Sequence, residues 1–377
     1  MRKFPICFVI IYLLIILTGC GASTADSSNG GADMENTPTD GDESENNYIS
    51  MTTEITELEP GFSAVRYDSD YAFDLFLEQG GASSDQDVLQ FLTETLFKGN
   101  VGLQMSGGVF GCSTIFVSNT DGGYLFCRNI DWHTCDALVA AAYPEEGYAP
   151  ISTVNQDFIR KDAGFAVNML TDEMMTVAAL YAPLDGMNEK GLCVSVNMIQ
   201  DGEAIHQNTG KPNITTTTAV RLMLDKATTV REALELLQQY DLHSSMEYMV
   251  HFAIADNDGN SVAVEYVDNE MIVTETPILT NFYLAAGEKN GVGTQQSHTR
   301  FEILMETLEE NPSMTAQEVR DALDSVSKDN FGEFESTEWS VVFDQTDLTA
   351  AYYHRENYET GYSFQLLDTN HAGYTYW

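Results

Sequence analysis

From residue 112 to the end of the chain, the apolar residues are distributed mainly as in strands joined by tight turns. Apolar-rich runs at 112–118 and 123–130 flank the turn Asp121-Gly122-Gly123, a strong hairpin pattern. A second hairpin is predicted for 251–255 and 261–267, on either side of an acidic turn. Further strands are expected at 176–181, 192–197, 338–344, 349–354 and 361–367.

One helix is predicted upstream of these strands. After Ser84, the apolar residues Val88, Leu92 and Leu96 recur every four positions, which is typical of an amphipathic helix with a serine cap. The glycines that follow, up to Gly111, indicate a loose approach to residue 112. A glycine-rich linker between two domains would have the same composition.

More helices are predicted in the middle of the strand-rich block. Capping-box patterns at Thr229–Glu232 and Thr315–Glu318 each open a helix, and another is expected at about 298–309. Because strands dominate both ends of 112–377 and helices its middle, the pattern predicts an α+β layered fold with antiparallel sheets.

The first residues have the pattern of a targeting segment. Basic residues 2–3 precede an apolar run at 4–17, which is too short for a comfortable membrane span. Leu17-Thr18-Gly19-Cys20 resembles the lipobox of bacterial lipoproteins, in which the cysteine is lipidated after cleavage. Residues 1–19 are therefore expected to be a lipoprotein signal peptide and Cys20 the lipidation site, which places the protein on the extracellular face of the bacterial cell membrane. An ordinary signal or an uncleaved anchor is the alternative.

Three further segments are expected after the signal. Residues 20–47 are polar and acidic, with almost no apolar content, and are predicted to be a disordered tether. Residues 48–111 are expected to be a pro-segment or α-chain that packs on the catalytic domain. That domain is assigned to residues 112–377.

The charge of the chain limits its partners. Asp and Glu number 58 against 17 Lys and Arg, which gives a formal net charge of −41. Nucleic acid is excluded as a partner because binding requires neutralisation of its phosphates by basic side chains. Anionic lipid headgroups would also repel the chain, so membrane attachment is expected through the lipid anchor alone.

The cysteines left after processing are too few for a disulfide scaffold. One disulfide among Cys127, Cys135 and Cys193 is left open, because pairing cannot be read from the sequence. A zinc site using Cys127, His133 and Cys135 lacks a fourth ligand and matches no standard spacing. No metal and no cofactor is predicted.

Cys112 is the strongest candidate for a nucleophile. A nucleophilic thiol needs a proton acceptor, and His133 cannot be placed near it from the sequence. If the chain is cut before Cys112, the α-amine of that residue becomes the acceptor. Arg128 and Asp131 lie on the predicted neighbouring strand, where they could serve the thiolate and the amine. Taken alone, Cys112 reads as a small buried apolar residue, and Arg128 with Asp131 as an ordinary ion pair.

An ordered series of motifs across 112–377 resembles the choloylglycine hydrolase and penicillin V acylase family of N-terminal nucleophile hydrolases. The motifs are Cys112-Ser113-Thr114, Arg128-Asn129-Ile130-Asp131-Trp132, Gly186-Met187-Asn188-Glu189-Lys190-Gly191-Leu192, Asn197, Leu279-Thr280-Asn281, Ser297-His298-Thr299-Arg300-Phe301 and Trp339-Ser340-Val341-Val342.

The resemblance implies a four-layer αββα sandwich that hydrolyses carbon–nitrogen bonds of linear amides without a cofactor. It implies Cys112 as nucleophile with its own amine as base, after autocatalytic cleavage at Gly111–Cys112. It further implies that Arg128 lies by the thiolate and Asp131 holds the amine. The remaining implied residues are Asn197 and Asn281 in the oxyanion hole and Arg300 in support of the nucleophile.

Several alternatives stay open beside this expectation. Bile salt hydrolases of the family expose the cysteine by removing the initiator Met, whereas about ninety residues separate Cys20 from Cys112 here. Long pro-segments are similar to those of the acid ceramidase and N-acylethanolamine amidase relatives, whose cleaved segment stays attached. The amphipathic helix at 88–96 favours such retention. An acyltransferase and a non-catalytic binding lipoprotein are the competing functions.

The partner expected for the leading function is a small-molecule amide. Bile salts, penicillin V, N-acylethanolamines and acyl homoserine lactones all remain open as substrates. A homo-oligomer is also left open, since some relatives are tetramers.

Overall fold

A computed structural model of the chain describes residues 48–98, 111–160, 171–200, 202–328 and 335–367. The expected signal peptide, the expected lipidation site Cys20, the expected tether and the glycine-rich approach at 99–110 lie outside these residues. No helix in the described part of the chain is long and apolar enough to cross a membrane.

Among the described residues, the larger sheet has nine strands. Each neighbouring pair is antiparallel except β2 and β5, which run parallel. The order is β1 (Thr56–Glu59), β2 (Phe62–Tyr67), β5 (Ala137–Ala142), β6 (Pro150–Asn155), β7 (Asp185–Asn188), β8 (Cys193–Met198), β11 (Val250–Ala255), β12 (Ser261–Val267) and β13 (Glu270–Glu275).

The second sheet, within the same described ranges, holds the predicted hairpin around Asp121. Its order is β14 (Ile278–Leu279), β3 (Gly111–Asn119), β4 (Tyr124–Trp132), β16 (Ser336–Asp344), β17 (Thr349–His354) and β18 (Gly361–Gln365), with β15 (Ser313–Met314) parallel to β3. A separate short parallel pair joins β9 (Asn213–Thr215) to β10 (Asp241–His243). Both predicted hairpins are confirmed, the second as β11 and β12.

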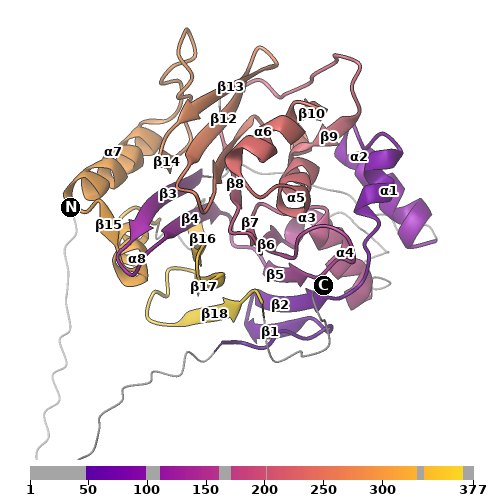
Figure 1. Cartoon of the computed structure of the whole chain (residues 1–377), viewed down its shortest axis with the longest axis horizontal. Helices are drawn as coiled ribbons and strands as arrows, with labels where there is room; N and C mark the ends of the chain where they lie inside the picture. Colours follow the sequence, from indigo (N-terminus) through magenta and orange to yellow (C-terminus); the bar gives the residue numbers. More distant parts are fainter. Residues whose placement is uncertain (1–47, 99–110, 161–170, 201, 329–334, 368–377) are drawn as a thin grey trace, which may run out of the picture. The chain divides into compact units, whose positions relative to one another are not determined.

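The two sheets stack, and helices cover their outer faces (Figure 1). On β3, Cys112 and Phe116 point into the core between the sheets, while Ile115 and Val117 point into a second cluster under helices. This alternation follows from the two-residue period of a strand. The second cluster is covered by α7 (Gln295–Glu310) and α8 (Ala316–Asp324), and the larger sheet by α4 (Asp172–Leu180), α5 (Thr216–Lys226) and α6 (Val230–Leu237). The predicted α+β, four-layer αββα architecture is confirmed.

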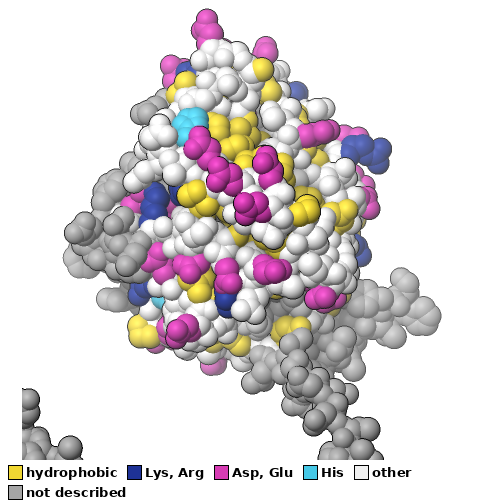
Figure 2. All heavy atoms as spheres, turned by 90° about the vertical axis from the view of Figure 1, so that its left-hand side faces the viewer, with side chains coloured by type: hydrophobic (Ala, Val, Ile, Leu, Met, Phe, Trp, Pro, Cys, Tyr) yellow, Lys and Arg dark blue, Asp and Glu magenta, His cyan; other side chains and the backbone are white. Residues whose placement is uncertain are grey.

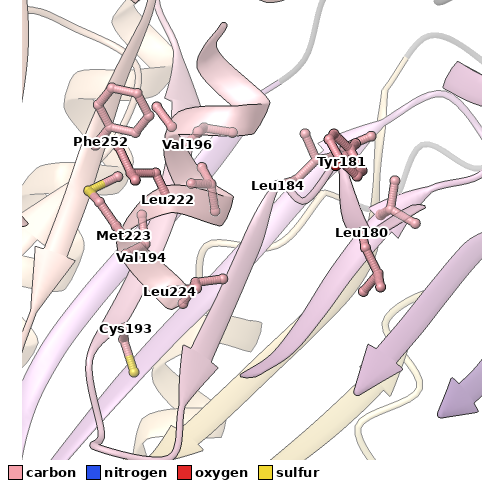
Figure 3. Close-up of a cluster of buried hydrophobic side chains, with 14 of the residues drawn as sticks. Leu180, Tyr181, Leu184, Cys193, Val194, Val196, Leu222, Met223, Leu224 and Phe252 are labelled. Carbon is pink, nitrogen blue, oxygen red and sulfur yellow. The ribbon is translucent and has the colours of Figure 1, made fainter. Parts of the chain in front are cut away.

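The helical layer on the larger sheet packs through α5. Figure 3 shows Leu222, Met223 and Leu224 of this helix beside Val194 and Val196 of β8. These side chains are at most 1% exposed. Their burial fixes β8 in the middle of the sheet, and β8 carries residues of the candidate site.

The prediction of a strand at 176–181 is wrong. This stretch lies in α4, whose N-terminus is capped by the Thr171 side chain accepting a hydrogen bond from the Met174 backbone N–H. All residues from Met175 to Leu180 are buried, so the helix has no polar face along this run. A short, fully apolar stretch has no period that would separate a buried helix from a buried strand.

The predicted helix caps are mostly confirmed. Ser84 caps α2 (Asp85–Phe91), which continues as a π-helical turn at Leu92–Leu96. Thr315 and Glu318 form the full capping box of α8. In α6 the Thr229 side chain caps the helix, but the carboxylate of Glu232 accepts from Thr228, so the box is incomplete. The helix expected at 298–309 begins earlier, at Gln295. The remaining helices are α1 (Phe73–Glu78), α3 (Asp157–Arg160) and a 3-10 turn at Ser245–Glu247.

The described part of 48–111 is built into the same core. Strand β2 pairs with β5 over six register positions, from Phe62 opposite Ala137 to Tyr67 opposite Ala142. The hydroxyl of Tyr71 donates to Asp225 of α5 at 2.6 Å. Residues 48–98 therefore belong to the larger sheet and to the helical layer beside it.

The surface is acidic, in keeping with the composition. On the face shown in Figure 2, acidic side chains are widespread and basic ones few. All four cysteines of the described residues, Cys112, Cys127, Cys135 and Cys193, are buried free thiols. The described ranges hold no group of three or more His, Cys, Asp or Glu side chains arranged to bind a metal.

Candidate active site

Cys112 is the second residue of β3 and lies fully buried between the two sheets. Its Sγ accepts a hydrogen bond from Nη2 of Arg128 at 3.2 Å and lies 3.7 Å from the carbonyl oxygen of Val196. Its backbone N–H donates to Oδ1 of Asn281 at 2.8 Å. Because Gly111 and Cys112 are consecutive residues of β3, this nitrogen belongs to the Gly111–Cys112 peptide bond.

Arg128 comes from the adjacent strand β4 and is fully buried. Its Nη1 donates to the carbonyl oxygen of Leu184 at 2.5 Å and to Oδ2 of Asp185 at 3.1 Å. Its Nη2 donates to the carbonyl oxygen of Val196 as well as to the thiol. One guanidinium therefore ties the Cys112 thiol to two strands of the opposite sheet.

Asp185 is a site residue that the sequence analysis missed. It is fully buried in β7, where it pairs with Arg128 and accepts a hydrogen bond from Nε1 of Trp339 at 3.1 Å. Burial raises the pKa of the Asp185 carboxyl, against the opposing charge of Arg128. The signal in the sequence was a carboxylate inside the apolar run 184–187, because a charge in a buried strand requires a partner.

Arg300 on α7 binds the backbone around the thiol from the other side of the smaller sheet. Its Nη1 donates to the carbonyl oxygen of Cys112 and to Oγ of Ser113, both at 2.7 Å. The same nitrogen lies 3.2 Å from Oδ2 of Asp131. Its Nη2 donates to Oδ1 of Asn281 at 2.8 Å. Arg300 thus joins three of the predicted site residues to one another.

Asp131 lies beside the bond that is expected to be cut. In the β3–β4 register it stands opposite Gly111, and it is fully buried. Its Oδ1 accepts a hydrogen bond from the Thr337 hydroxyl at 2.8 Å, and Nζ of Lys328 lies 3.5 Å from its Oδ2. Thr337 and Lys328 were not predicted, since nothing local in the sequence brings them to β4.

Asn281 contacts Cys112 directly, and its amide group is partly engaged. Oδ1 accepts from the Cys112 backbone and from Arg300, while Nδ2 donates to the carbonyl oxygen of Met198 at 2.7 Å. An amide nitrogen has two hydrogens, so one donor of Asn281 remains for another acceptor.

Asn197 has a different set of partners, and among the described residues its side chain makes no hydrogen bond to Cys112. Its Nδ2 donates to the carbonyl oxygens of Leu279 at 3.1 Å and Thr280 at 3.4 Å. Its Oδ1 accepts from the Thr114 hydroxyl at 3.2 Å. The side chain therefore links β8 to β3 and to the segment that leads into Asn281, and its expected role in the oxyanion hole stays a prediction.

The surroundings of the Cys112 thiol favour its neutral form. Burial raises the pKa of Cys112, and the charge of Arg128 opposes this only in part. His133 is exposed, and its ring packs edge-on against Trp132. Its imidazole is therefore not placed to act as a base for the buried thiol. Activation of the thiol therefore requires a proton acceptor other than His133.

Described residues line two cavities of note. The first lies away from the candidate site residues, and the second lies beside them. One, of about 1180 Å³, lies between α6 and the β11–β12 turn, and none of the predicted site residues lines it. We therefore do not assign it to the substrate. The other, of about 300 Å³, lies between α7 and the end of α8, with Arg300 and Lys328 in its wall.

Comparison with known proteins gives a family and a fold. Residues 112–282 match the model of the linear amide C–N hydrolases, choloylglycine hydrolase family. Two mutant forms of the conjugated bile acid hydrolase from Clostridium perfringens superpose with TM-scores of 0.52 and 0.50, at 17% and 16% sequence identity. The matches cover 67% and 68% of this chain and 92% of each hydrolase chain.

The penicillin V acylase from Agrobacterium tumefaciens is also similar, with a TM-score of 0.46 and 18% identity over 64% of this chain and 83% of that chain. A comparison with curated proteins gives no match. The bile acid hydrolase structures share the fold described above. Residues 112–282 thus match the choloylglycine hydrolase family of linear amide C–N hydrolases, which confirms the resemblance read from the sequence motifs.

Proposed function

We propose that this protein hydrolyses the amide bond of small N-acyl amides, among them conjugated bile-acid-like compounds, with Cys112 as an N-terminal nucleophile. The observation that carries the proposal is the set of contacts at Cys112. Its thiol lies 3.2 Å from a buried guanidinium, and its backbone N–H and carbonyl are bound by Asn281 and Arg300. Such a fixed backbone is what a nucleophile needs when its own nitrogen is to act as the base.

Self-cleavage comes first in this proposal. The thiol attacks the carbonyl carbon of Gly111, the Gly111–Cys112 amide bond breaks, and the acyl group passes to sulfur while the thiol proton goes to the departing nitrogen. Water then hydrolyses the thioester. This step leaves a carboxylate on Gly111 and both a free thiol and a free α-amine on Cys112.

Turnover repeats the same chemistry on the substrate. The α-amine, whose unperturbed pKa is about 7.7–8.0, takes the thiol proton as sulfur attacks the substrate carbonyl. The resulting ammonium then protonates the departing amine of the substrate, and water attacks the thioester to release the acid. The positive charge of Arg128 stabilises the thiolate, since its guanidinium is held beside the sulfur by Leu184 and Asp185.

The oxyanion is assigned chiefly to Asn281. Its Nδ2 keeps one hydrogen free beside Cys112, whereas Nδ2 of Asn197 is engaged with two carbonyl oxygens. We therefore propose that Asn197 contributes by positioning the segment that carries Asn281. Removing an oxyanion donor typically raises the barrier by about 2.7–4 kcal/mol.

The first experiment compares residues 48–377 with their Cys112→Ala variant by intact mass and N-terminal sequencing. We expect two fragments in the parent, one of them starting at Cys112, and a single chain in the variant. Cys127→Ala is the matched control, because it removes another fully buried thiol in a different cluster and should still be cut. The cut protein is then assayed on conjugated bile salts, penicillin V and N-acylethanolamines, with and without an added amine acceptor.

The outcomes separate the competing functions. Release of the free acid alone supports a hydrolase, while transfer of the acyl group to the added amine supports an acyltransferase. A parent chain that remains whole and turns over none of the amides would contradict the proposal and favour a binding protein.

Attachment to the membrane is part of the same proposal. We propose that Cys20 is lipidated and holds the domain at the extracellular face of the bacterial membrane. Metabolic labelling with palmitate is expected to mark the parent and to leave the Cys20→Ser variant unlabelled. Equal labelling of both would exclude this anchor.

A further inference from the structure

Three charged side chains surround Gly111, the residue before the proposed cut. A Cβ atom on Gly111 would lie 2.7 Å from Oε1 of Glu335 and 2.8 Å from both Oδ2 of Asp131 and Nζ of Lys328. These groups come from three places in the fold: β4, the residues after α8, and the residue directly before β16. A side chain at this position would have to displace these charged atoms.

Glu335 is the member of this group with unused hydrogen-bonding capacity. It is 7% exposed, and its Oε2 pairs with Nζ of Lys328 at 2.6 Å. Its Oε1 is buried and has no hydrogen-bond partner among the described residues. Buried carboxylate oxygens without a donor are uncommon in folded proteins, and this one faces the residue whose bond to Cys112 would be cut.

Cleavage would create the missing donor. In the uncut chain the nitrogen of Cys112 carries one hydrogen, which goes to Oδ1 of Asn281. After the bond to Gly111 breaks, the same nitrogen carries additional hydrogens on the side where Gly111 stood. That side is lined by Oδ2 of Asp131, Oε1 of Glu335 and Nζ of Lys328, and of these the two carboxylate oxygens are acceptors.

We propose that Glu335, together with Asp131, receives the α-amino group of Cys112 once the Gly111–Cys112 bond is cut, and so positions the amine as the base. This inference rests on the proposed function. It makes Glu335 a positioning residue of the same site, and it accounts for a buried acceptor that the uncut chain leaves unsatisfied.

The proposed position of Glu335 beside the α-amine of Cys112 affects the pKa of that amine. Asp131 and Glu335 favour its charged form, while the nearby cations disfavour it. Removing the charge of Glu335 lowers the pKa of the amine, and it also releases Lys328 from its closest carboxylate, which acts in the same direction. Among the described residues, the charged groups that face this position are Asp131 and Arg128 of β4, Arg300 of α7, Lys328 and Glu335, beside the Cys112 thiol itself.

The test compares Glu335→Gln with the parent in the full chain. The matched control is Glu338→Gln, which also removes a buried carboxylate held in an ion pair, but one that contacts Arg355, Ser336 and Cys135. Intact mass first establishes cleavage in each protein. The pH dependence of kcat/KM is then measured on an amide that the parent hydrolyses.

We expect the acid limb of the Glu335→Gln profile to move to lower pH by about 1 unit, with KM little changed and the Glu338→Gln profile unchanged. An acid limb identical to that of the parent would overturn the proposal. If Glu335→Gln does not cut itself, a site-specific protease sequence placed directly before Cys112 supplies the free amine in both proteins, and the same shift is expected. A cut parent that hydrolyses no amide would instead refute the proposed function, and this inference with it.

Discussion

The two pieces that the proposed cleavage would produce should remain one protein. The described part of the upstream piece places seven Phe, Val and Leu side chains, each at most 5% exposed, in the shared core. At about 1.5–3 kcal/mol for each buried side chain, their burial contributes roughly 10–20 kcal/mol. Association costs roughly 4–15 kcal/mol. The seven are Phe62, Val65, Phe73, Phe76, Val88, Leu89 and Leu92.

Hydrogen bonds add to this balance. We count about 1 kcal/mol for the β2–β5 strand pairing as a whole. The hydrogen bond between Tyr71 and Asp225 adds about 1 kcal/mol. Taking the middle of each range, the net free energy of association is roughly 8 kcal/mol, which corresponds to a dissociation constant of about 1 μM or tighter.

The measurement is size-exclusion chromatography of the cut protein over a dilution series, with each fraction analysed by mass spectrometry. Both fragments should elute together at concentrations about 10-fold above this dissociation constant, and denaturant should separate them. Phe76→Ala should weaken the association roughly a hundredfold or more, because a buried Phe→Ala change costs about 3–5 kcal/mol. Leu75→Ala, at a neighbouring position that is 39% exposed, is the control. Elution of the parent fragments as separate species at 10-fold above the expected constant of about 1 μM would refute the reasoning.

Two further predictions concern buried polar groups. Arg128→Met should lower the free energy of unfolding at pH 7 by about 3–5 kcal/mol, because Asp185 loses its buried partner. The folded-state pKa of Asp185 is raised above the unfolded value, so its ionised form opposes folding at neutral pH. The deficit in urea denaturation should therefore shrink as pH falls from 7 toward 5 and the carboxyl protonates; a deficit independent of pH would contradict this. For turnover, Asn281→Ala should lower kcat by about 10²–10³-fold with KM little changed, whereas Asn197→Ala should lower kcat less but reduce stability more. Equal kinetic losses without a difference in stability would show that both side chains act on the oxyanion.

The sequence predicted those parts of the fold in which the deciding interactions are local. The Asp121-Gly122-Gly123 turn specifies its hairpin, and Thr315 with Glu318 specifies the start of α8, because each pattern involves neighbours in the chain. The stretch 176–181 was misassigned because a helix buried on all sides has no alternation of polar and apolar residues. Its state is decided by what packs on it.

The same distinction applies to the site. The family motifs identified Cys112, Arg128 and Asp131, which lie on one hairpin. Asp185 and Glu335 were missed because their proximity to that hairpin depends on the stacking of two sheets and on the return of the chain into β16. Neither carries a local pattern beyond being an acidic residue at the edge of, or within, a buried strand.

The parallel pairing of β2 with β5 has a consequence for the lifetime of the protein. The chain that connects these two strands contains the Gly111–Cys112 bond, so cleavage converts neighbouring strands of one sheet into strands of two different polypeptides. Refolding of the uncut chain is a first-order process, whereas recovery of the cut protein requires two molecules to meet and therefore slows with dilution. A single unfolding event at low concentration is then effectively final. The working life of the cut protein is set by how slowly it unfolds, not by its equilibrium stability.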